Sequence, residues 1–143
     1  MSLIRRLLGA WRSPVESPSY DPHTDGEPDP GEVVWGWVPY EEDASQGKDR
    51  PVLLLYREPD GWAGLQLTSK DHDRDMADEA RWGRYWMDVG SGDWDREHRP
   101  SEVRLDRLVH LPDEGIRREG AALEPAIYER VVAEAARFHS WPG

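Results

Sequence analysis

The sequence predicts a small, mainly β domain of α+β character, in which short strands form a barrel that one C-terminal helix closes. Three patterns carry this prediction: alternating apolar residues over 33–40, a continuous apolar run over 51–58, and an apolar stripe at helical spacing over 127–138. A period of 2 is typical of strands, and a period of 3.6 is typical of helices. The 143 residues suit one domain, so we expect a single core.

The composition narrows the class of protein. Eight tryptophans and five tyrosines offer bulky anchors for a core, although 33% of the residues are charged. The absence of cysteine excludes disulfides, thiolate zinc sites and cysteine nucleophiles. Because no apolar run approaches the roughly 20 residues that a bilayer requires, we expect no membrane span and a cytoplasmic location.

The charge balance is acidic throughout. The net charge is −11, with 3 basic and 5 acidic residues in 1–30 and 15 basic and 24 acidic residues in 31–143. Phosphate backbones favour proteins that neutralise them with lysine and arginine. This balance disfavours tight, non-specific binding of nucleic acid.

Shifts in composition divide the chain into three parts. Residues 1–13 place apolar side chains at helical spacing and predict a short amphipathic segment. Residues 14–30 are rich in proline and acidic residues and predict a disordered linker, since they bury too little apolar area to offset their ordering entropy. Residues 31–143 are expected to form the barrel domain.

Within that domain the strands follow one another at close spacing. Residues 33–40 alternate, and 51–58 and 62–69 read as a hairpin closed by Pro59-Asp60-Gly61. An exposed loop or short helix over 70–81, a strand over 85–90 and a turn-rich connection lead to one further strand over 101–111. Pro125 suits the first turn of the closing helix.

The order of these segments resembles the MazF/PemK family of toxin endoribonucleases. The matching pieces, spread over residues 31–138, are GEVVWGWVPY, then GKDRPVLLLYR, then LQLTS, and finally RPSEVRLDRLV before the helix. The resemblance implies an SH3-like, MazF-type barrel. It also implies a homodimeric toxin of a type II toxin–antitoxin system, which cleaves single-stranded RNA without a metal or other cofactor and is silenced by a cognate antitoxin.

By the same resemblance, the family's catalytic arginine falls on Arg50 and its catalytic threonine on Thr68. Around them we expect Lys48, Ser69 and Trp37 to contact the RNA. Tryptophans on one strand face can stack bases, although alternation requires Trp35 and Trp37 to be either both buried or both on a groove or dimer surface.

Elementary chemistry supports a role for Arg50 independently. Attack of a ribose 2′-hydroxyl on the adjacent phosphate builds negative charge, which a planar guanidinium can stabilise. Pro51 biases Arg50 toward extended geometry, and a hairpin would bring Thr68 close to it. Arginine is a poor general base because it stays protonated. Glu41, Asp49 and His72 remain open as proton acceptors.

Simpler interpretations stand beside these. In one of them Arg50 is only a strand-edge cation paired with Asp49 or Glu42, and Thr68 and Ser69 are ordinary residues for a strand end. Residues 71–75 contain ligands for a divalent metal, but we favour a solvated loop, and we take 90–92 as a flexible turn rather than a phosphate loop. The alternative function is a catalytically silent barrel that binds a protein or peptide.

Overall fold

The computed structural model describes residues 17–23, 27–69 and 85–141, and within these ranges the chain forms seven β-strands, one short 3₁₀ helix and one α-helix. The elements are β1 (Glu32–Pro39), β2 (Gly47–Glu58), β3 (Gly61–Ser69), β4 (Trp86–Gly90), β5 (Ser101–Arg104), β6 (Val109–Pro112), η2 (Asp113–Gly115), β7 (Ile116–Ala122) and α3 (Pro125–Ala135). No helix in these ranges is long and apolar enough to cross a membrane.

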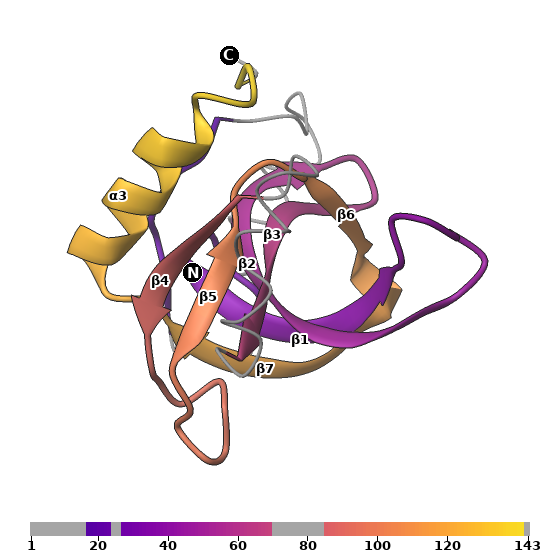
Figure 1. Ribbon diagram of the computed structural model, residues 1–143, viewed down its shortest axis with the longest axis horizontal. Helices are drawn as coiled ribbons and strands as arrows, with labels where there is room; N and C mark the ends of the chain where they lie inside the picture. Colours follow the sequence, from indigo (N-terminus) through magenta and orange to yellow (C-terminus); the bar gives the residue numbers. More distant parts are fainter. Residues whose placement is uncertain (1–16, 24–26, 70–84, 142–143) are drawn as a thin grey trace.

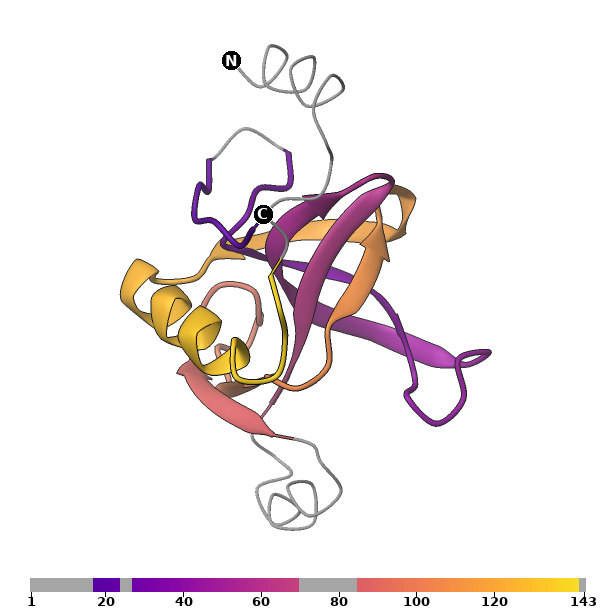
Figure 2. The same ribbon diagram turned by 90° about the horizontal axis from the view of Figure 1, so that it is seen from above.

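The strands form one antiparallel sheet that curls into a half-barrel (Figure 1). Its order is β4-β5-β3-β2-β1-β7, and β6 also pairs with β3. Both views place α3 and the loop between β1 and β2 on opposite sides of the barrel (Figures 1 and 2). The prediction of a small, mainly β barrel with a C-terminal helix is therefore confirmed.

The predicted hairpin is present. β2 and β3 pair from Glu58↔Gly61 to Val52↔Gln66, with an irregularity between Leu54 and Tyr56. β2 begins at Gly47, earlier than the apolar run that starts at 51, because its polar first residues pair with the end of β1. Backbone pairing, which does not depend on side-chain polarity, extends the strand beyond its apolar part.

The expected single strand over 101–111 is wrong, since this segment contains two strands. β5 pairs with β3 at 67–69, whereas β6 pairs with β3 at 61–64. The bend at 105–108 carries the chain from one end of β3 to the other. β7, which pairs with β1, was not expected from the pattern of residues 116–122.

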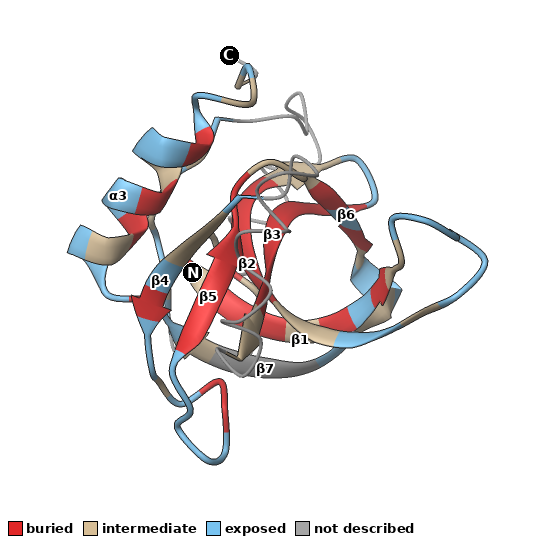
Figure 3. Cartoon of the chain, viewed as in Figure 1, coloured by how far each residue is buried: buried red, intermediate tan, exposed pale blue. Residues whose placement is uncertain are grey.

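Apolar side chains are buried on both faces of the curled sheet rather than in one core. The first cluster lies beneath α3. The helix contributes Tyr128, Val131 and Ala135 to this cluster. The second cluster lies on the other face and comprises Val34, Val38, Val52, Leu54, Trp62, Val109 and Leu111. Figure 3 shows buried residues along β2 and β3 and on the side of α3 that meets the sheet.

Part of the expected linker packs against the barrel. The backbone N–H of Ser19 donates to the carbonyl of Leu55 at 3.2 Å, and the Tyr20 hydroxyl donates to the carbonyl of Leu123 at 2.6 Å. The ring of Tyr20 lies 5.3 Å from that of Tyr128, centroid to centroid. Residues 17–23 therefore cover the first cluster, and the segment expected at 1–13 lies outside the described residues.

The role of Tyr20 can be tested by unfolding in urea. We expect Tyr20→Ala to lower the free energy of unfolding by about 2 kcal/mol, because it removes a large ring from the edge of a core. Tyr20→Phe should lower it by about 1 kcal/mol, since only the hydrogen bond to Leu123 is lost. Unchanged stability in the alanine variant would mean that this segment does not contribute to the fold.

Candidate functional site

Arg50 lies near the start of β2, where its Cα partner on β1 is Gly36. Alternation puts the Arg50 side chain on the same face as Val52 and Leu54, which belong to the second cluster. A Cβ on Gly36 would come within 2.5 Å of Leu111 Cδ1, so glycine lets β6 close over this face. Along β2, Arg50 therefore follows directly on the apolar residues of the second cluster, whereas on β1 the cluster continues to Val38.

Thr68 lies near the end of β3, opposite Glu102 of β5. The pairing of β2 with β3 ends at Val52↔Gln66, and Arg50 and Thr68 each lie two residues beyond that pair. A step of two residues returns each strand to the same face. Arg50 and Thr68 thus share one face at the point where β3 leaves β2 for β5, and no hydrogen bond joins these two side chains.

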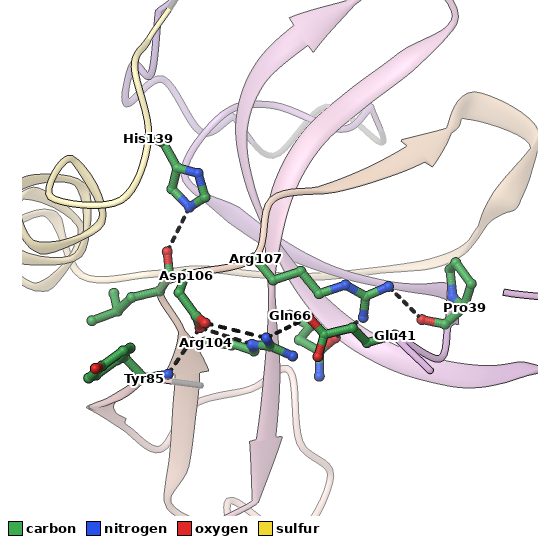
Figure 4. A network of polar contacts seen from close by, with 9 residues as sticks. Pro39, Glu41, Gln66, Tyr85, Arg104, Asp106, Arg107 and His139 are labelled. Carbon is green, nitrogen blue, oxygen red and sulfur yellow. Dashed lines mark hydrogen bonds and ion pairs between the residues drawn. The ribbon is translucent and has the colours of Figure 1, made fainter. Parts of the chain in front are cut away.

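Arg104 of β5 projects from the same face, since it lies two residues from Glu102. It is 5% exposed and holds two carboxylates: its Nε lies 2.9 Å from Asp106 Oδ1, and a terminal nitrogen lies 3.0 Å from Glu41 Oε2 (Figure 4). Burial alone would lower the pKa of Arg104, but the hydrogen bonds to Asp106 and Glu41 outweigh it and raise the pKa. Arg104 is therefore neutralised locally.

Asp106 is held in place by the backbone around it. The N–H of Tyr85 donates to Asp106 Oδ1 at 3.0 Å. In the adjoining residue, the carbonyl of Leu105 accepts a hydrogen bond from His139 Nε2 at 2.8 Å (Figure 4). The C-terminal segment therefore fixes the bend that carries Asp106 and Arg107.

Arg107 differs from Arg104 in its partners. Its two terminal nitrogens donate to neutral oxygens, one to Gln66 Oε1 at 3.2 Å and the other to the Pro39 carbonyl at 2.8 Å (Figure 4). The side chain is half-buried, and desolvation, followed by the charge of Arg104, lowers its pKa. Its hydrogen bonds to described residues thus orient the guanidinium without neutralising it.

Arg50 is also half-buried, and it interacts with the charges of described residues electrostatically, without an ion pair or hydrogen bond to them. Desolvation lowers its pKa most, Arg107 lowers it further, and Tyr40 and Glu42 oppose that shift. The alternative pairing with Asp49 is not formed, because Asp49 lies on the other face, 3.6 Å from Arg117 Nε. Glu42 likewise forms no ion pair with Arg50.

The residues expected to bind RNA do not gather in one place. Lys48 is exposed on the same face as Arg50, two residues before it. Trp37, 38% exposed, pairs with Asp49 and therefore faces the opposite side. Ser69, next to Thr68 and opposite Ser101, also alternates away from the Arg50 face.

The second tryptophan of β1 accompanies Trp37 outside the fully buried core. Trp35 is half-buried, and its indole N–H donates to the carbonyl of Trp94 at 2.7 Å. The two tryptophans share one face of β1, as alternation requires, and neither is fully buried.

Of the possible proton acceptors, the two that the structure describes lie apart. Glu41 lies among the arginines through its ion pair with Arg104, whereas Asp49 lies on the opposite face. His72 and the rest of residues 71–75 lie outside the described residues. Among the residues that are described, no group of three or more histidines and carboxylates is arranged to hold a metal ion.

Sequence reasoning missed Arg104, Asp106, Arg107 and Gln66 as members of this site. The available signal was the position of polar residues within apolar strands: Gln66 interrupts Leu65 and Leu67, and Arg104 lies between Val103 and Leu105. Charged residues are rarely buried unless they are paired. Such interruptions mark positions where polar contacts are to be sought.

The ion pairs of Arg104 can be separated by substitution. We expect Asp106→Ala to lower the free energy of unfolding by about 3 kcal/mol, because it strips a buried guanidinium of its closest carboxylate. Glu41→Ala should lower it by less than about 1 kcal/mol, since the Glu41 side chain is 45% exposed. Urea unfolding at pH 7 measures both, and equal losses would contradict this ranking.

No protein-family model matches this chain, and no curated protein matches it. Membership of the MazF/PemK family therefore stays a prediction from the order of motifs in residues 31–138.

Proposed function

We propose that this protein is a metal-independent endoribonuclease that cleaves single-stranded RNA on the face carrying Arg50 and Thr68, as the toxin of a toxin–antitoxin pair. The observation that carries the proposal is the state of Arg50, which is half-buried, contacts no carboxylate of the described residues and shares a face with Thr68. A desolvated guanidinium binds an oxyanion more strongly than a solvated one does.

In the proposed reaction the 2′-oxygen of one nucleotide attacks its own 3′-phosphate. The bond from the 2′-oxygen to phosphorus forms while the bond from phosphorus to the 5′-oxygen of the next nucleotide breaks. Arg50 donates hydrogen bonds to the non-bridging oxygens, whose negative charge grows in the transition state. The Thr68 hydroxyl donates to the same group. The products carry a 2′,3′-cyclic phosphate and a 5′-hydroxyl.

The proton of the 2′-hydroxyl requires an acceptor. Glu41 is favoured over Asp49 because it lies on the side of the arginines and is held there by Arg104. In this scheme the proton passes to the Glu41 carboxylate, and the departing 5′-oxygen takes a proton back from it. Each proton is thus accounted for without a metal ion.

The acidic composition is compatible with this proposal if RNA binding is local. Arg50 and Arg107 concentrate positive charge on one face of a chain whose net charge is −11. Such local fields direct an anion to one place, whereas the remaining acidic surface repels nucleic acid. Under the same proposal the protein is a homodimer that a cognate antitoxin holds inactive.

The test is the cleavage of single-stranded RNA of varied sequence by purified protein. We expect Arg50→Ala to lower the cleavage rate by about 100-fold or more, since one preorganised donor to a growing oxyanion is lost. Thr68→Val, which keeps the shape but removes the hydroxyl, should also lower the rate.

Arg117→Ala is the matched control, because Arg117 is exposed and contacts Asp49 on the opposite face. It should cleave like the wild type, and the products should end in a cyclic phosphate. A wild-type protein, free of any partner, that leaves all the RNAs intact would refute the enzyme.

A second candidate, a silent barrel that binds a protein or peptide, is favoured by the exposure of Trp37. Large aromatic side chains on a surface commonly anchor partners. If this is the function, Trp37→Ala should abolish retention of a partner that the wild type holds in a pull-down, while RNA stays uncut. Tyr85→Ala is the control, since Tyr85 is another large aromatic side chain that is exposed, at 43%. Equal retention by the wild type and the Trp37 variant would contradict it.

A further inference from the structure

We infer that Arg50 and Arg107 together form a two-arginine clamp for one phosphate group, with Arg107 as a phosphate-binding residue positioned by Gln66 and the carbonyl of Pro39. The clamp rests on the proposed function only for the identity of its natural ligand, a phosphodiester of RNA. The binding of a phosphate anion follows from the geometry itself.

The first argument is the contrast with other arginines of the chain. Arg57 holds Asp113 with two nitrogens at 2.6 and 3.0 Å, Arg99 holds Asp95 at 2.8 Å, and Arg104 holds Asp106. These pairs are what an excess of acidic residues, 29 against 18 basic, leads one to expect. Arg50 and Arg107 are half-buried, and no carboxylate in the described part of the chain contacts either of them, although acidic residues lie nearby.

The second argument is mutual repulsion. β2 lies between β1 and β3, and Arg107 bonds to Gln66 of β3 and to the Pro39 carbonyl at the end of β1, so its guanidinium lies across β2 near Arg50. There its positive charge lowers the pKa of Arg50, and the two cations disfavour one another. Partly desolvated like charges destabilise a fold unless a counter-charge lies between them. An oxyanion bound by both guanidiniums would supply that counter-charge.

The third argument is the fixed orientation of Arg107. One of its terminal nitrogens is held by Gln66 and the other by the Pro39 carbonyl, from β3 and from the end of β1. A guanidinium has five N–H donors, so these two bonds leave others free for a ligand. Because both acceptors are neutral, Arg107 keeps its full charge for an anion.

A phosphate fits this arrangement better than a carboxylate does. Two guanidiniums that approach from β2 and from the bend after β5 suit a tetrahedral group, whose oxygens point in several directions. Glu41 and Glu42 lie within electrostatic reach of Arg107 and would weaken the binding of any anion. We therefore expect a dissociation constant in the millimolar range for inorganic phosphate and tighter binding when RNA adds further contacts.

The experiment is a titration of the full chain with inorganic phosphate, followed by ³¹P NMR and by the melting temperature, with sodium chloride at matched ionic strength as the reference. We expect saturable binding by the wild type and at least a tenfold weaker affinity for Arg107→Gln and for Arg50→Gln. Arg117→Gln is the control and should bind like the wild type.

A purely structural role for Arg107 predicts that Arg107→Gln melts below the wild type in phosphate-free buffer. The clamp predicts that this variant melts no lower, because the repulsion that it relieves compensates for the two lost hydrogen bonds. Should this variant fail to fold, Arg50→Gln decides, since the Arg50 side chain forms no hydrogen bond to a described residue. Absence of saturable phosphate binding by the wild type, or unchanged binding by both variants, would overturn the clamp.

Two further measurements separate this inference from the proposed nuclease. A single-stranded oligonucleotide of 2′-deoxynucleotides, which cannot undergo the reaction, should displace phosphate from a site made for RNA, whereas a site for free phosphate would ignore it. If phosphate binds through Arg107 but RNA stays intact, the nuclease fails and the clamp stands. If RNA is cut equally well by Arg107→Gln, the clamp fails and the nuclease stands.

Discussion

The burial of β2 on both of its faces is the constraint from which the rest of the structure follows. Val52 and Leu54 point to one side of the strand, whereas Leu53 and Leu55 point to the other, and all four are inaccessible to solvent. A sheet with two apolar faces needs a cover on each. Helix α3 and the segment around Tyr20 cover one face, and the curling of the sheet, completed by β6, covers the other.

The candidate site lies where this second cover ends. Beyond Val52, β2 continues with Arg50, while β3 turns from β2 toward β5. Between strands that separate in this way, polar side chains are partly shielded from water, although apolar side chains do not fill the space beside them. That position explains why the arginines are desolvated enough to have altered pKa values and still remain on an accessible face.

The arginines have two different relations to the fold. Arg104 is buried and paired with Asp106 and Glu41, so its charge is used within the molecule and ties the β1–β2 loop to β5. Arg50 and Arg107 retain charge that described carboxylates do not neutralise by contact. Proteins commonly hold such unfavourable arrangements where a ligand completes them. A fold that only needed stability would gain from replacing one of the two.

Sequence alone determined the elements whose signal is local. Alternation located β1, the Pro59-Asp60-Gly61 turn located the hairpin, and helical spacing located α3, because each pattern records which side of one element is buried. Through the resemblance to a known family it also predicted Arg50 and Thr68 as site residues, and the hairpin accounts for the face that they share. Tertiary structure alone decided which strand pairs with which: it divided 101–111 into two strands, added β7 and turned Trp37 away from Arg50. It also brought Arg107 to Gln66, 41 residues apart in the chain. Those outcomes depend on how the sheet closes on itself, and closure is a property of contacts between distant segments that no local period encodes.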